Sequence, residues 1–182
     1  MIGAIKLPLT KRFKQILSAT AGLGMAIAVT GCGSSQSGAG QYEATAKATY
    51  TWRVNYQNDP MEDKRGRFQK FESNSIINVN GEKPEGAVYQ DDQGIWWSKV
   101  PPKPSIDELE AGKKKSYEKI GKPELLRQVE YRVTFNKDDE KLNLPTNYAV
   151  YRQVAKNYPD TPINFTLGIN NGSVTKATPV TN

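Results

Sequence analysis

The sequence contains no histidine and only one cysteine, Cys32. Without histidine there is no imidazole to act as a general base near neutral pH, to bind zinc in the usual way, or to serve in a His-based catalytic triad. A single cysteine cannot form an internal disulfide, and without histidine it cannot belong to a Cys–His catalytic pair. P-loop, Rossmann and Cys-x-x-Cys redox motifs are also missing. We therefore expect neither a metal nor a cofactor.

Acidic residues are absent from the first 31 positions, which distorts the charge of the whole chain. The formal net charge is +6, but four of the 25 basic residues lie in that stretch: Lys6, Lys11, Arg12 and Lys14. The remainder carries 21 basic and 19 acidic side chains. Because a nucleic-acid-binding domain needs a basic face, this near balance predicts no nucleic-acid partner.

The basic start of the chain is followed by a short run of apolar and small residues, Ile16–Val29. The run has about 14 residues, against the roughly 20 that a transmembrane helix needs. Gly22 and Gly24 weaken it further as a permanent membrane span. A charged start and a short apolar run are typical of a secretory signal, and we predict that residues 1–31 are one.

Val29-Thr30-Gly31-Cys32 ends this run and resembles the lipobox of bacterial lipoproteins. The resemblance implies recognition of the first three residues by a signal peptidase, cleavage before Cys32, a diacylglycerol thioether on its sulfur, and often a third acyl chain such as palmitate on the new amine. Several acyl chains hold a protein lastingly, at about 0.8 kcal/mol per buried methylene. Gly33 is not Asp, which favours the outer membrane in a Gram-negative host. The alternative is an uncleaved anchor with an incidental cysteine.

The residues after the cysteine are rich in glycine and serine: 33–41 read Gly-Ser-Ser-Gln-Ser-Gly-Ala-Gly-Gln. Such chains are flexible and bury little apolar surface. We therefore predict a lipidated cysteine and a flexible tether over 32–41, which holds the protein on the order of 15–20 Å from the lipid surface. A single domain is predicted over 42–182, with a tail after 173 that frays or pairs back.

The predicted domain is dominated by alternation of apolar and polar residues. The longest example, over 44–57, predicts a strand with one buried and one solvated face, as is common in antiparallel sheets. Its inward residues are expected to be Ala44, Ala46, Ala48, Tyr50, Trp52, Val54 and Tyr56. Further strands are predicted at 68–79, 87–90, 95–100, 127–136 and 163–169.

Two helices are predicted in addition. Ser105 and Glu108 have the spacing of a capping box, which predicts a helix over 106–119, although Gly112 weakens its middle. Apolar residues recur at helical spacing over 147–157. The expected fold class is therefore α+β: a mainly antiparallel sheet of about five to six strands with two short helices.

Adjacent Trp96 and Trp97 are candidates for contact with a partner or a glycan. Neighbouring strand residues face opposite sides, so one indole can enter the core while the other stacks on a sugar, a lipid headgroup or a protein. The alternative is that both are covered, one by the sheet core and the other by a helix or by the proline segment Pro101–Pro104. The stretch Gly94–Glu108 is similar to uncharacterised small cyanobacterial envelope proteins, a resemblance that implies no activity.

Charged side chains provide two further candidate sites. Lys113, Lys114 and Lys115 could meet anionic lipid headgroups, each cation adding about 1 kcal/mol close to the surface; the alternative is a solvated helix face balanced by nearby acids. The acids at 91–92 and 138–140 could supply a pair for glycoside hydrolysis, which requires carboxyls about 5–9 Å apart. Adjacent acids in turns more often cap the turn.

Together these observations predict a non-enzymatic lipoprotein of the cell envelope, anchored on the non-cytoplasmic side of a membrane. Its partner is expected to be another envelope protein or peptidoglycan. Two alternatives remain: a glycan-binding module that uses Trp96 or Trp97, and a carboxylate-dependent glycan hydrolase.

Overall fold

The computed structural model describes residues 34–38, 40–58 and 66–180. All of them belong to one compact unit that spans Gly31–Asn182. The predicted export signal, Val29, Thr30, Gly31 and Cys32 lie outside the described residues. Within the described ranges, no helix has both the length and the apolar character needed to cross a membrane.

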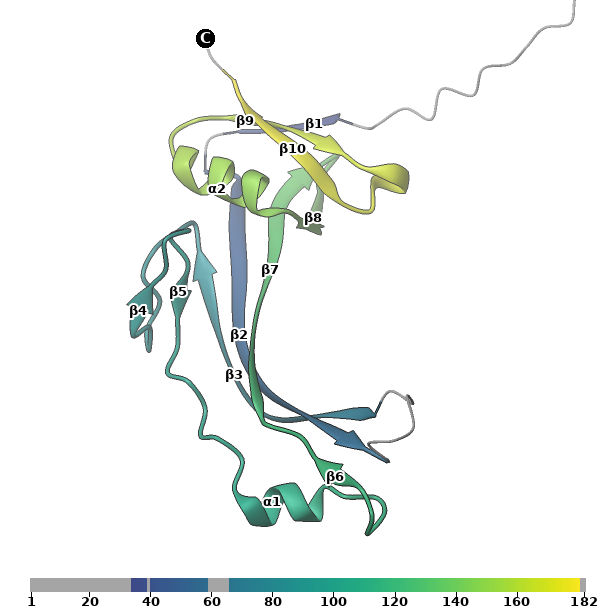
Figure 1. Cartoon of the computed structure of the whole chain (residues 1–182). Helices are drawn as coiled ribbons and strands as arrows, with labels where there is room; N and C mark the ends of the chain where they lie inside the picture. The colour runs from purple at the N-terminus through teal and green to yellow at the C-terminus, as the bar shows by residue number, and fades with distance from the viewer. Residues whose placement is uncertain (1–33, 39, 59–65, 181–182) are drawn as a thin grey trace, which may run out of the picture. The chain divides into compact units, whose positions relative to one another are not determined.

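A long central strand, β2 (Tyr42–Gln57), organises the larger sheet (Figure 1). It lies between β3 (Arg67–Val79) and β7 (Glu124–Lys137), and it is antiparallel to both. Beyond β7 lies β8 (Glu140–Thr146), and the short β6 (Lys119–Ile120) pairs with the end of β2. The strands predicted over 44–57, 68–79 and 127–136 are confirmed.

A second sheet has the order β1-β9-β10. Its central strand is β9 (Ile163–Leu167), which pairs antiparallel with β1 (Ser34–Ser37) and with β10 (Val174–Pro179). A short 3-10 turn, Ile169–Asn171, connects β9 to β10. The strand predicted around 163–169 is thus confirmed, and the tail after 173 pairs back instead of fraying.

The flexible tether predicted over 32–41 is wrong for Ser34–Ser37, which form β1. Ser35 and Ser37 face inward and are buried, because their small side chains fit beneath the sheet. The physical reason lies in β9, which is buried on its apolar face and would otherwise leave one edge unpaired. Composition predicted flexibility here, but the open edge of β9 provides backbone partners that composition does not reveal.

The Trp pair lies in a small hairpin formed by β4 (Tyr89–Gln90) and β5 (Trp96–Trp97), which are shorter than the strands predicted at 87–90 and 95–100. The hairpin is joined to the large sheet by Asn78, a fully buried side chain of β3. Its amide nitrogen donates to the carbonyls of Ala46 (3.1 Å) and Trp96 (3.0 Å), and its amide oxygen accepts from the backbone N–H of Trp96 (2.7 Å). The side chain of Asn78 therefore joins β3 to β5 by hydrogen bonds, in place of backbone pairing between the two strands.

Both predicted helices form, but one is short. α2 (Tyr148–Asn157) matches the prediction and packs Val150, Tyr151 and Val154 into the core. α1 (Ile106–Ala111) has the predicted Ser105–Glu108 capping box but ends at Gly112 instead of continuing to 119. A Cβ at Gly112 would lie 2.3 Å from the Tyr56 hydroxyl, so only glycine fits where the chain leaves the helix.

The predicted α+β class is therefore wrong, and the fold is β-rich. Of the described residues, 51% lie in strands and 14% in helices. The share of strand exceeds the expected share because α1 stops early and because β1, β6 and β8 were not predicted. The two-residue turn at Asp138 and Asp139 that starts β8 has φ values of 49° and 65°, as expected for a tight hairpin between twisted strands.

The core forms where the two sheets and α2 meet. Phe135 of β7 stacks on Phe165 of β9, with ring centroids 4.6 Å apart, and Tyr42 of β2 contacts Phe165 edge-to-face at 6.1 Å. Ala44, Ala46 and Ala48 are buried on the inward face of β2. Methyl side chains at three successive inward positions leave room for α2, whose buried residues belong to the same cluster.

We predict that Asn78→Ala lowers the free energy of unfolding by about 2–4 kcal/mol, because one buried N–H and two carbonyls lose their partner. Asn74→Ala is the matched control: Asn74 also lies on β3 but makes one bond, to the carbonyl of Lys99. Its expected cost is about 0.5–1.5 kcal/mol. Urea unfolding of both variants measures the difference, and equal costs would contradict the role given to Asn78.

Candidate functional site

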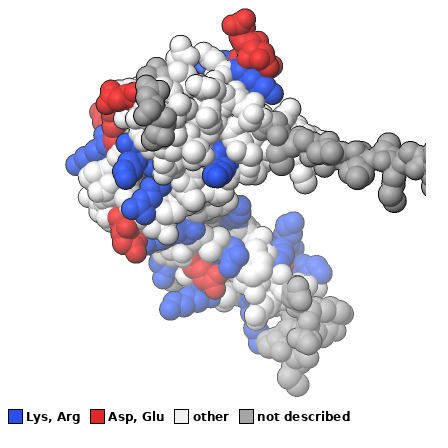
Figure 2. All heavy atoms as spheres, turned by 90° about the horizontal axis from the view of Figure 1, so that it is seen from above, with Lys and Arg blue, Asp and Glu red and all other residues white. Residues whose placement is uncertain are grey.

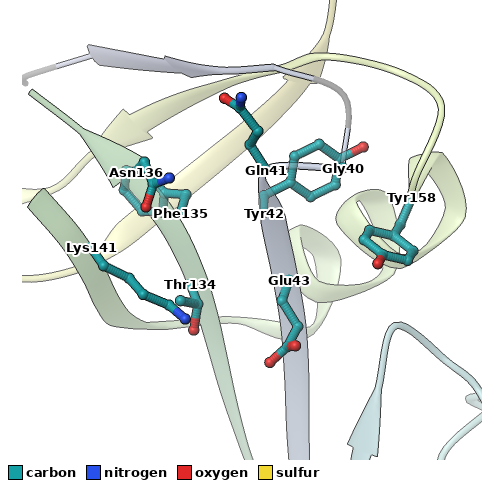
Figure 3. Close-up of a pocket in the computed structure, with 9 residues that line it drawn as sticks. All are labelled: Gly40, Gln41, Tyr42, Glu43, Thr134, Phe135, Asn136, Lys141 and Tyr158. Atoms are coloured by element: carbon teal, nitrogen blue, oxygen red, sulfur yellow. The ribbon is translucent and has the colours of Figure 1, made fainter. Parts of the chain in front are cut away.

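An open pocket of about 310 Å³ lies where β2 begins (Figure 3). Register explains its position: Tyr42 pairs with Phe135 and Glu43 with Thr134, while Asn136 of β7 pairs with Lys141 of β8. Tyr158, at the end of α2, closes one side of the pocket. Four segments that are distant in sequence thus line it: Gly40–Glu43, Thr134–Asn136, Lys141 and Tyr158.

The pocket combines aromatic rings with several kinds of polar group. Tyr42 is buried, and its hydroxyl lies 2.9 Å and 2.5 Å from the carbonyls of Asn157 and Thr161. Burial, aided by Asp160, raises the pKa of Tyr42, which keeps this hydroxyl protonated. Four polar side chains of the pocket make no hydrogen bond to any other residue that the structure describes: Gln41, Glu43, Asn136 and Lys141.

Those uncommitted groups define what the pocket can do. Amides donate and accept, a carboxylate accepts, an ammonium donates, and the half-exposed ring of Tyr158 offers an apolar face. Figure 3 shows the ammonium end of Lys141 directed towards Thr134, at one wall of the pocket. The arrangement suits a polar, hydroxyl-rich ligand better than an apolar one.

Of the predicted Trp pair, Trp97 lies in the core and Trp96 is partly exposed. Trp97 is buried, its ring centroid lies 4.8 Å from that of Tyr50, and its Nε1 donates to Asp91 at 2.7 Å. Trp97 is therefore not a contact residue. Trp96 is half-buried, and the ammonium of Lys83 lies 5.2 Å from its ring centroid, so one face of the indole is already covered.

The lysines at 113–115 lie on the loop between α1 and β6, not on a helix face. Lys113 pairs with Glu110 (2.7 Å), and the ammonium of Lys115 lies over the exposed Tyr117 ring. Lys114 and Lys115 are exposed. Figure 2 shows lysines and arginines spread over the visible face, with aspartates and glutamates among them.

A buried carboxylate, Glu118, fixes the shape of this loop. Arg67 of β3 donates to it through Nε (2.9 Å) and Nη2 (2.8 Å), and the backbone N–H of Lys114 donates at 2.7 Å. The hydrogen bonds from Arg67, followed by those from the loop backbone, lower the pKa of Glu118 to about 2. The guanidinium of Arg67 also lies over the Tyr56 ring, 4.2 Å from its centroid.

Two other acids, Asp91 and Glu108, have structural roles. Asp91 accepts from the backbone N–H groups of Gln93 and Ile95 and from Trp97, which fixes the hairpin turn. Glu72 and Glu108 line a small pocket of about 110 Å³, but the Glu108 carboxylate accepts from Ser105. Hydrogen bonds from Ser105 lower the pKa of Glu108, so it is ionised and poorly suited to be the general acid of a hydrolase.

Sequence reasoning missed every residue that lines the pocket at the start of β2. No motif links them, and only the register of β2, β7 and β8 brings them together. It named Trp52 as an inward residue of the strand but missed its hydrogen bond: the Nε1 of Trp52 donates to the carbonyl of Pro101 (3.0 Å) and holds the proline segment. Among the residues that the structure describes, no cluster of three or more acids, cysteines or histidines could hold a metal ion.

Comparison with protein-family models, with curated proteins and with solved structures finds no match to this chain.

We predict that Glu118→Gln destabilises the protein at neutral pH. Because the folded pKa of Glu118 lies near 2, below its unfolded value, its contribution is complete above about pH 5 and is lost as the pH falls towards 2. Unfolding free energies measured from pH 7 to pH 2 should therefore converge for the variant and the unmodified protein.

Glu124→Gln is the control, since Glu124 pairs with Arg53 in a more exposed ion pair of 2.8 Å and should matter much less. Parallel pH profiles for Glu118→Gln and the unmodified protein would contradict the assigned role of Glu118.

Proposed function

We propose that this chain is a lipid-anchored protein of the bacterial envelope that binds another envelope component and has no enzymatic activity. Support for the anchor comes from Val29-Thr30-Gly31-Cys32 behind a basic start and a short apolar run. The observation that carries the binding role is the pocket at the start of β2, where uncommitted polar side chains surround an open volume of about 310 Å³.

Two features favour binding over catalysis. The pocket holds one carboxylate, Glu43, whereas hydrolysis of a glycoside requires two that face each other. The carboxylates whose pKa values are lowered, Glu108 and Glu118, are engaged in a helix cap and in an ion pair. Neither is available as a proton donor at neutral pH.

An envelope glycan is the ligand that the chemistry of the pocket favours over a protein. Sugars present hydroxyl groups to amides and charged groups, and they stack their apolar faces on aromatic rings. Gln41, Asn136, Lys141 and Glu43 offer the first kind of contact, and Tyr158 offers the second. The glycan hypothesis therefore moves from the Trp pair to this pocket, because Trp97 is buried.

The proposal is tested by photo-crosslinking in cells from benzoylphenylalanine in place of Tyr158. Tyr117 is the matched control position, because it is an exposed tyrosine beside α1, away from the pocket. We expect an adduct from position 158 that contains peptidoglycan fragments, is much weaker from position 117, and falls several-fold in Lys141→Ala and in Cys32→Ser.

A single protein adduct from position 158 would replace the glycan with a protein partner. No adduct from 158, or equal adducts from both positions, would contradict binding at the pocket. An adduct that is unchanged in Cys32→Ser would contradict the need for the anchor.

A further inference from the structure

The turn between β9 and β10 lies at the same end of its sheet as the start of β1. Ser34 pairs with Thr166, and on the other side of β9 Thr166 pairs with Lys176. One residue after Thr166, β9 ends and the chain enters the turn Ile169–Asn171. Figure 1 shows β1 running alongside β9 in this sheet. The chain therefore leads back towards Cys32 from beside this turn.

Chain length limits how far Cys32 can lie from the turn. Two peptide units separate Cys32 from Ser34, paired strands lie about 5 Å apart, and three units separate Thr166 from Ile169. The Cα atom of Cys32 is thus within about 24 Å of that of Ile169 even at full extension. By contrast, β2 alone extends over 16 residues, roughly 50 Å along the strand, towards α1.

The turn presents an apolar side chain on a well-defined backbone. Ile169 is 87% exposed, more than any other large hydrophobic residue in the described part of the chain. Asn170 and Asn171 adopt left-handed conformations, with φ values of 53° and 54°, and the Gly172 N–H donates to the Ile169 carbonyl at 3.1 Å. These features hold Ile169 at the tip of the turn.

The charge of the hairpin fits a lipid surface. Residues 161–180 include no aspartate or glutamate, and their one cation is the exposed Lys176. Lys176 and Ser34 pair with Thr166 from opposite sides of β9. A lysine can lay its methylenes along an apolar surface and keep its ammonium among phosphate groups. A hairpin that faces an anionic bilayer would carry this combination.

We propose that the β9–β10 turn is a membrane contact, in which Ile169 enters the interfacial layer of the bilayer that holds the acyl chains of Cys32. The inference rests on the proposed lipid anchor. One isoleucine is too small to recruit a protein to a membrane, but the acyl chains already hold this end at the surface. The turn then fixes the orientation of the domain, with the loop after α1 directed away from the bilayer.

The test uses the full lipidated protein with an environment-sensitive fluorophore on a new cysteine. The thioether occupies the sulfur of Cys32, so Ile169→Cys supplies the free thiol for labelling. Ile106→Cys is the matched control, because Ile106 is 77% exposed but lies at the start of α1. Both proteins are reconstituted in vesicles of phosphatidylethanolamine and phosphatidylglycerol, and the mass of the acyl chains on Cys32 is checked in each.

We expect a blue shift and a several-fold stronger quenching by nitroxide lipids for the label at 169 than for the label at 106. Equal quenching at the two positions, or none at 169, would overturn the inference if the acyl mass is present on Cys32. Absence of the acyl mass would instead overturn the lipid anchor, and the inference with it.

Discussion

The pairing of β2 with strands on both sides is the constraint on which the rest of the structure depends. β2 pairs with β3 and with β7 along most of its length, and its alternate residues face the core. A slip of one residue would turn the alanines and tyrosines of that face outward, so the register is strongly specified. This register brings Tyr42 and Glu43 beside Phe135 and Thr134, and it thereby creates the pocket at the start of the strand.

The two ends of β2 are stabilised by different interactions. Near Tyr42, aromatic packing joins the two sheets, with Phe135 stacked on Phe165. Near Tyr56, a smaller cluster of Val54, Tyr56 and Leu109 is completed by the buried carboxylate of Glu118 and its hydrogen bonds from Arg67. The hydroxyl of Tyr42 donates to a backbone carbonyl at the end of α2, and the hydroxyl of Tyr56 donates to one at the end of α1. Each bond fixes the end of its helix. Of these two tyrosines, Tyr42 lines the pocket, and its hydroxyl is held by the carbonyls of Asn157 and Thr161.

Alternation predicted β2, β3, β7 and β9, and apolar residues at helical spacing predicted α2, because each pattern is local and matches its burial. They failed where a tertiary partner decides the structure. Ser34–Ser37 become a strand because β9 offers an open edge, and the residue at the end of α1 must be Gly112 because Tyr56 occupies the space that a Cβ would need. The pocket had no signal in the sequence, since its residues meet only through strand register. The burial of Trp97 could not be predicted either, because its ring packs against Tyr50, which is distant in the sequence.

Only Gly33 separates Cys32 from β1 in the sequence. This spacing and the pocket at the start of β2 support the proposal of a binding domain held close to a membrane. The structure places Ser34–Ser37 in the folded sheet and not in a tether. Hydrogen exchange of the segment 34–41 in the purified protein distinguishes these two arrangements. We expect slow exchange over Ser35–Ser37, comparable to that of β10. Exchange at the rate of an unstructured Gly/Ser chain would contradict it and would return the domain to the end of a flexible linker.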